Sequence, residues 1–177
     1  AIRQGRPERP GEYTRRVGVH ELGHAVLAIV LGHASEGTVS IVERGERLGL
    51  TSMRMCCRSL TRRALEEQIM VQMGGRAAEH VVFGDVSTGS GGSEDSDLVK
   101  ATGIGIDMLL AYGMSNRGLL EAYPPDERKA MLLALPEVRR ELGEILKDAE
   151  ERAREIIIRH RAGLEQALGE LLAAKGL

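Results

Sequence analysis

The stretch TRRVGVHELGHAVLAIVLG at residues 14–32 decides the fold of this chain, because it combines a long helical pattern with a cluster of titratable side chains. Its apolar residues recur every three or four positions, the spacing of one face of an α-helix. They are Val17, Val19, Leu22, Val26, Leu27 and Ile29. Thr14 is a suitable N-cap and Gly32 a natural C-terminal stop. We therefore predict a helix over residues 14–31.

Within that helix, the pentapeptide HELGH at residues 20–24 has the spacing of a metal site. Residues four apart lie one above the other, so the imidazoles of His20 and His24 can bind one zinc ion. Glu21 is offset to the side, where its carboxylate can take a proton from a metal-bound water. The pentapeptide also occurs by chance. The alternative is therefore that it binds no metal and that both histidines only pack against neighbours. Its position inside an amphipathic helix favours the zinc site.

The residues alone leave the third metal ligand open. The extended pattern HExxHxxGxxH is excluded, because Leu27 and Val30 stand where it needs glycine and histidine. The ligand must therefore come from elsewhere in the chain. The acidic candidates are Glu79, Asp95 and Asp97, and the weaker histidine candidates are His33, His80 and His160.

The rest of the chain predicts a mainly α fold with a small β-hairpin. Alternating, β-branched residues at 38–43 and 48–53 indicate two neighbouring strands. Helical spacing follows from Thr61 to Val82, ending at Gly84. After a Gly- and Ser-rich loop at 87–96, a third helix is expected over 98–112, and apolar stripes beyond Pro136 predict a C-terminal helical hairpin. We expect a disordered lead-in at 1–12 and one domain at 13–177, with its core at about 13–120 and a helical part at about 124–177.

The composition excludes nucleic acid as a partner. The net charge is −2, and the aromatic residues are only three tyrosines and one phenylalanine, so neither a basic field nor a stacking platform for nucleic acid is present. Cys56 and Cys57 are adjacent, which favours a reducing compartment over a disulfide framework. There is neither an apolar run of about 18 residues nor a signal peptide, so we expect a cytoplasmic polypeptide.

Several segments, which follow one another in the same order along the chain, resemble the peptidase domain of the FtsH-type ATP-dependent zinc metalloproteases. The matching segments are HELGHA (20–25), VSIVERGERLGLT (39–51), GGRAAEHVVFG (74–84), STG (87–89), SDLVKAT (96–102), GMS (113–115) and PEVRRELGEIL (136–146). The resemblance implies an FtsH-like zinc peptidase domain over residues 13–177. It also implies that any membrane attachment is made through segments absent from this chain.

The resemblance also implies roles for individual residues. His20, His24 and Asp97 become the zinc ligands and Glu21 the catalytic base, because Asp97 stands where the family motif has an aspartate just before a helix. Glu79 becomes a group that orients a liganding imidazole. The chain departs from the family pattern at Leu22, His80 and Ile106, and in a longer loop before Asp97, which indicates a divergent branch.

The function expected from the resemblance is an endopeptidase that cuts unfolded or motor-delivered polypeptide. None of the four lysines is followed by Ser or Thr, so the chain contains no Walker A sequence. An AAA ATPase module, in the same full-length protein or in trans, is therefore the expected partner, and the family implies a homo-hexamer. The strand at 48–53 could pair with an extended substrate or serve only in core packing. The alternatives are a zinc-binding structural or assembly module without effective proteolysis and, less favoured, a non-peptidase hydrolase.

Overall fold

The computed structural model describes residues 10–41, 50–55 and 60–174 of the chain. The elements in chain order are α1 (Pro10–Val30), β1 (Ala34–Ser40), β2 (Leu50–Met55), α2 (Arg62–Phe83), the 3₁₀ turn η1 (Thr88–Ser90), α3 (Asp97–Leu110), α4 (Pro125–Ala134), α5 (Pro136–Arg159) and α6 (Arg161–Ala173). The predicted class, mainly α with a small β-hairpin, is confirmed. Among these residues, no helix is both long and apolar enough to cross a membrane.

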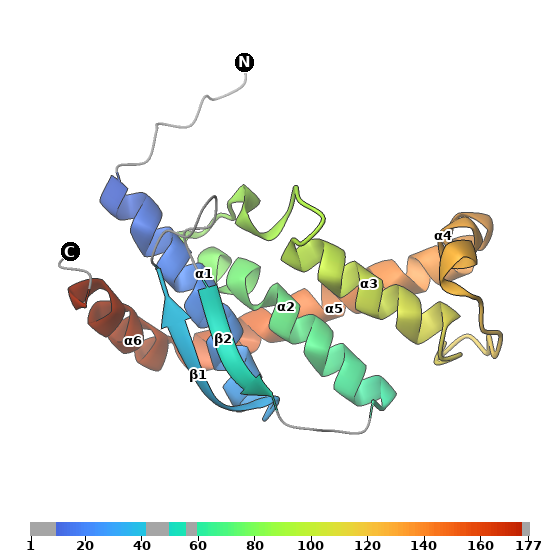
Figure 1. Ribbon diagram of the computed structural model, residues 1–177, viewed down its shortest axis with the longest axis horizontal. Helices are drawn as coiled ribbons and strands as arrows, with labels where there is room; N and C mark the ends of the chain where they lie inside the picture. Colours follow the sequence, from blue (N-terminus) through green and yellow to red (C-terminus); the bar gives the residue numbers. More distant parts are fainter. Residues whose placement is uncertain (1–9, 42–49, 56–59, 175–177) are drawn as a thin grey trace, which may run out of the picture.

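Helix α2 lies at the centre and packs against α1, α3 and α5 (Figure 1). It crosses α1 at two glycines, where the backbones come into direct contact. A Cβ atom at Gly23 would lie 2.2 Å from the carbonyl oxygen of Gly74, and one at Gly74 would lie 2.7 Å from that of Gly23. A side chain at either position would force the helices apart. This close crossing brings the histidine-bearing face of α1 against α2.

The ends of the helices follow local chemistry. Helix α2 begins after Thr61, whose side chain accepts a hydrogen bond from the Ala64 amide at 3.2 Å, and ends at Gly84 with φ of 77°. Both ends agree with the prediction. Helix α1 begins at Pro10 rather than after Thr14, so the predicted start was wrong. Proline is tolerated in a first helical turn because its missing N–H would have no partner there. Residues 1–9 of the predicted lead-in lie outside the described residues.

The two strands form an antiparallel pair beside α1. Their register runs from Ala34 opposite Met55 to Ser40 opposite Leu50, with an irregularity between Ala34 and Glu36. The predicted hairpin is therefore present, although its tip at 42–49 lies outside the described residues. In this register Thr51 lies opposite Val39. Pairing with β1 thus fixes the position of Thr51 along the axis of α1.

The C-terminal part consists of helices, as predicted, and these helices pack against α1, α2 and α3. Helix α5 packs along α2 and α3, whereas α6 turns away at His160 and packs against α1 (Figure 1). The contact with α1 is close, because a Cβ atom at Gly18 would lie 2.9 Å from Leu168 Cδ1. Helix α4, which the sequence did not predict, buries no residue.

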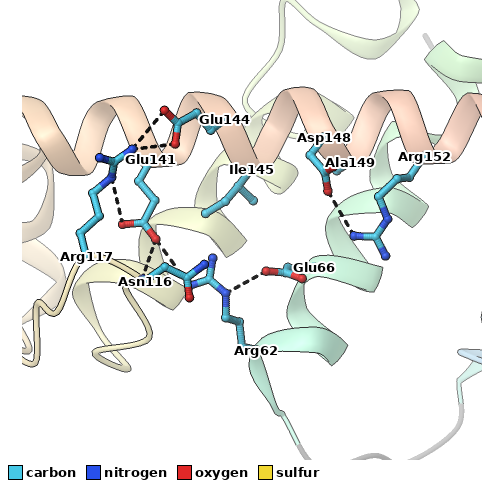
Figure 2. A pocket seen from close by; sticks show the side chains of 10 residues that line it. All are labelled: Arg62, Glu66, Asn116, Arg117, Glu141, Glu144, Ile145, Asp148, Ala149 and Arg152. Atoms are coloured by element: carbon cyan, nitrogen blue, oxygen red, sulfur yellow. Dashed lines mark hydrogen bonds and ion pairs between the residues drawn. The ribbon is translucent and has the colours of Figure 1, made fainter.

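A charged cavity of about 300 Å³ lies between the N-terminal end of α2, the segment after α3 and helix α5 (Figure 2). Glu141 on α5 is only 4% exposed, and it accepts hydrogen bonds from Ser115 Oγ at 2.6 Å and the Asn116 amide at 2.8 Å. It therefore anchors the chain that follows α3. The three arginines that line the cavity are each paired with a carboxylate: Arg62 with Glu66, Arg117 with Glu144 and Arg152 with Asp148. Two of these pairs lie within one helix, whereas Arg117–Glu144 joins the segment after α3 to α5, and Arg62 on α2 also lies 3.5 Å from Glu141 on α5.

Candidate metal centre

The structure brings His20, His24 and Asp97 to one point. The histidines lie on α1, and Asp97 is the first residue of α3, directly after the Gly- and Ser-rich loop. Asp97 Oδ2 lies 3.1 Å from His20 Nε2 and 3.3 Å from His24 Nε2, and the two Nε2 atoms are 3.2 Å apart. Ligands about 2.0–2.1 Å from a tetrahedral zinc ion are separated by about 3.3 Å. The three atoms therefore have the spacing that one zinc ion requires.

The two histidines are nearly buried, at 8% and 9% exposure. Burial alone lowers the pKa of His20, but hydrogen bonds to Asp97 and Glu79 outweigh it and raise the pKa to about 9. Burial raises the pKa of Asp97, whereas hydrogen bonds to His20 and His24 hold it well below its usual range. Without a metal His20 is therefore protonated at neutral pH. A metal ion that binds there replaces this proton, because a liganding imidazole must be neutral.

Each imidazole is oriented through its other nitrogen. His24 Nδ1 lies 2.8 Å from the Val71 carbonyl oxygen, which can only accept, so Nδ1 carries the proton and Nε2 presents a lone pair. His20 Nδ1 lies 2.7 Å from Glu79 Oε1. Both contacts reach from α1 to α2 and turn the Nε2 atoms towards Asp97. This is the arrangement usual around liganding histidines.

Glu79 is the most completely enclosed acidic group of the centre, with 1% exposure. It accepts hydrogen bonds from Arg16 Nη1 at 3.1 Å, the Ser87 amide at 2.8 Å and Ser87 Oγ at 3.0 Å. Burial raises its pKa, but hydrogen bonds from His20 and Ser87 lower the pKa on balance. Glu79 thus stays ionised, and it contacts the Nδ1 side of His20, opposite the point where the three ligand atoms meet.

Gly75 on α2 makes room for the His20 ring. A Cβ atom there would lie 2.4 Å from His20 Nε2 and 2.5 Å from Cδ2 and Cε1. Gly74 and Gly75 are adjacent in the sequence, and in the structure they contact different neighbours. Gly74 admits the backbone of α1, and Gly75 admits an imidazole.

Glu21 lies beside the cluster and contacts strand β2. Thr51 Oγ1 lies 2.7 Å from Glu21 Oε2 and 2.9 Å from the Glu21 carbonyl oxygen. Glu21, Thr51 and the three ligand residues line one cavity of about 490 Å³. Sequence reasoning missed Thr51, and no local signal could have found it, because the contact depends on strand register.

The other ligand candidates are not brought to this point. His33 is buried and pairs with Glu67 Oε2 at 3.1 Å, and His160 lies at the joint between α5 and α6. Asp95 lines the cavity, but its carboxylate is not among the converging atoms. Within residues 10–41, 50–55 and 60–174, the only group of three or more His, Cys, Asp or Glu with converging ligand atoms is that of His20, His24 and Asp97.

Comparisons with known proteins find similarity to zinc metalloproteases. The model of a family described as peptidase family M41 matches residues 10–177. The ATP-dependent zinc metalloprotease FtsH of Syntrophobacter fumaroxidans is 35% identical over 176 residues, covering 90% of this chain and 26% of that protein. FtsH 1 of Conexibacter woesei is 32% identical, covering 86% and 25%. FtsH of Thermobaculum terrenum is 38% identical over 138 residues, covering 76% and 21%. The chain spans about a quarter of the length of these relatives.

Proposed function

The chain belongs to peptidase family M41, and on that premise we propose that it is a zinc-dependent endopeptidase domain for unfolded or motor-delivered polypeptides. The observation that carries the proposal is the convergence of His20 Nε2, His24 Nε2 and Asp97 Oδ2 at 3.1–3.3 Å, within one cavity that also contains Glu21. Three protein ligands leave one coordination position open, which is typical of catalytic rather than structural zinc sites.

In this proposal His20, His24 and Asp97 bind the zinc ion, and Val71 and Glu79 orient the two imidazoles. A zinc ion bound there supplies Lewis acidity, which polarises the scissile carbonyl and acidifies a water molecule. Glu21 accepts the proton of that water and later delivers it to the leaving amine. Glu21 suits this task because it lines the same cavity as the three ligand residues, while its carboxylate is hydrogen-bonded to Thr51.

Strand β2 supports the proposed substrate class. In the described sheet it pairs with β1 alone, and Thr51 connects it to Glu21. An extended polypeptide that added a third strand along β2 would pass beside Glu21 with backbone hydrogen bonds and little sequence preference. We propose that the domain, over residues 13–177, receives such chains from an AAA ATPase module in the same full-length protein or in trans, and that it works as a homo-hexamer.

The substitution Glu21→Gln tests the enzymatic role against a zinc-binding structural or assembly module. Glutamine preserves the shape of the side chain but cannot accept the proton. We expect Glu21→Gln to retain zinc and fold while hydrolysis of an unfolded protein such as casein falls by about 10²–10⁴-fold. Glu155→Gln, at an exposed position of α5, serves as the matched control. Equal zinc-dependent hydrolysis by the wild type and Glu21→Gln would refute the role of Glu21.

A further inference from the structure

We propose that Thr51 is a positioning residue, which holds the Glu21 carboxylate beside the metal centre and leaves its second oxygen for the proton transfer. The inference rests on the proposed function of Glu21. Its basis is one hydroxyl group within hydrogen-bond distance of two acceptors of the same residue, Glu21 Oε2 at 2.7 Å and the Glu21 carbonyl oxygen at 2.9 Å.

The location of this hydroxyl is set by backbone structure. Thr51 is paired with Val39 in the strand register, and its β-branched side chain has few rotamers available. The Glu21 carbonyl oxygen belongs to the interior of α1, where one lone pair serves the helix and the other can accept from Thr51. The hydroxyl therefore has a fixed position relative to the backbone of α1. The carboxylate that it contacts is held in place by this hydroxyl, although a glutamate side chain has several free torsions.

The two carboxylate oxygens of Glu21 then have separate tasks. Among the described residues, Thr51 is the only side chain that hydrogen-bonds this carboxylate, and the bond goes to Oε2. Oε1 receives no hydrogen bond from those residues, so it stays available to accept the water proton. The liganding histidines do not hold Glu21, because His20 contacts Glu79 and Asp97 while His24 contacts the Val71 carbonyl. Positioning of the base thus depends on β2, outside the helix that carries the HExxH motif.

Removing the hydroxyl while preserving shape is the direct test. In Thr51→Val we expect zinc content and KM for an unfolded protein to stay within about twofold, while kcat falls by about 10–100-fold, because misplacing a reacting group by about 1 Å costs about that much. Thr51→Ser keeps a hydroxyl and should recover most of the activity. Thr102→Val is the matched control, since among the described residues its hydroxyl bonds only the Leu98 carbonyl of its own helix. Full activity in Thr51→Val, or failure of Thr51→Ser to exceed it, would overturn the inference.

Two further measurements separate positioning from a general effect on the fold. If Thr51 acts through Glu21, Thr51→Val should cause no further loss of the residual rate in a Glu21→Gln background, whereas a full additional loss contradicts it. A crystal structure of Thr51→Val should show the carboxylate displaced from its wild-type position with the ligand residues unmoved. An unmoved carboxylate overturns the inference whatever the activity. Full activity of Glu21→Gln would instead defeat the proposed function, so the two failures are distinguishable.

Discussion

Replacing Gly75 by alanine adds one methyl group directly against a proposed zinc ligand. The new Cβ atom would lie 2.4 Å from His20 Nε2 and 2.5 Å from two ring carbons. Favourable contacts between such atoms lie at about 3.5–4.0 Å, so the ring or the helix must move by about 1 Å. The ring cannot simply withdraw, because its Nδ1 atom is held by the buried Glu79.

A displacement of that size is large for a metal site, in which ligand distances hold to about 0.2 Å. Changes that only disturb the orientation of a ligand weaken metal binding by about 10–100-fold. We expect at least that loss for Gly75→Ala, since the ligand atom itself is displaced. Overpacking should also destabilise the fold by about 1–3 kcal/mol, offset by about 0.5–1 kcal/mol from replacing glycine inside a helix.

The assay is a zinc titration of metal-free protein, combined with denaturant unfolding. Gly103→Ala is the matched control, because Gly103 is an exposed position of α3 with no atom within 4 Å of the added methyl group. The control should bind zinc normally and become slightly more stable. If Gly75→Ala bound zinc as tightly as the control, the reasoning that His20 needs the space above Gly75 would be refuted.

Three other perturbations test the centre. Asp97→Ala should weaken zinc binding by more than about 100-fold and Asp95→Ala by far less, because only Asp97 approaches both Nε2 atoms; a zinc titration in which Asp95→Ala is the more damaging change would exclude Asp97 as the third ligand. Glu79→Gln should reduce zinc affinity by about 10–100-fold while the fold is kept, since the amide orients His20 without its charge; unaltered affinity would contradict the orienting role. In metal-free protein, the raised His20 pKa should stabilise the fold fully below the unfolded value of about 6.5 and cease to do so as the pH rises through about 9; denaturant unfolding should show this loss in the wild type and not in His20→Gln.

The sequence predicted the elements whose signals are local. Helix α2 was placed almost to the residue, because Thr61 and Gly84 are strong capping residues at its two ends. The predicted start of helix α1 was four residues late, since Thr14 is an acceptable cap and Pro10, a residue type that breaks helices except in their first turn, precedes it. Helix α4 was missed because it is short and its apolar residues are consecutive, at 130–134, rather than spaced as a helical stripe.

The candidate site divides in the same way. The spacing of His20, Glu21 and His24 determined by itself that two imidazoles would share one face of a helix, because four residues make about one helical turn. For the third ligand, the residues alone left three carboxylates open, and only the resemblance pointed to Asp97. To choose between Glu79 and Asp97 as the third ligand without the resemblance, one must know which carboxylate contacts Nδ1 of His20 and which contacts Nε2. Only the tertiary structure gives these contacts.

The sequence by itself therefore determined the helical scaffold, the HExxH pair and the class of chemistry, because these depend on residues within a turn or two of one another. Only the tertiary structure decided that Gly75 holds the His20 ring, that Glu79 orients it and that Thr51 contacts Glu21. Those contacts join residues 30 to 59 positions apart. Their geometry is set by the glycine crossing of α1 with α2 and by the register of two strands, which arise from packing rather than from local periodicity.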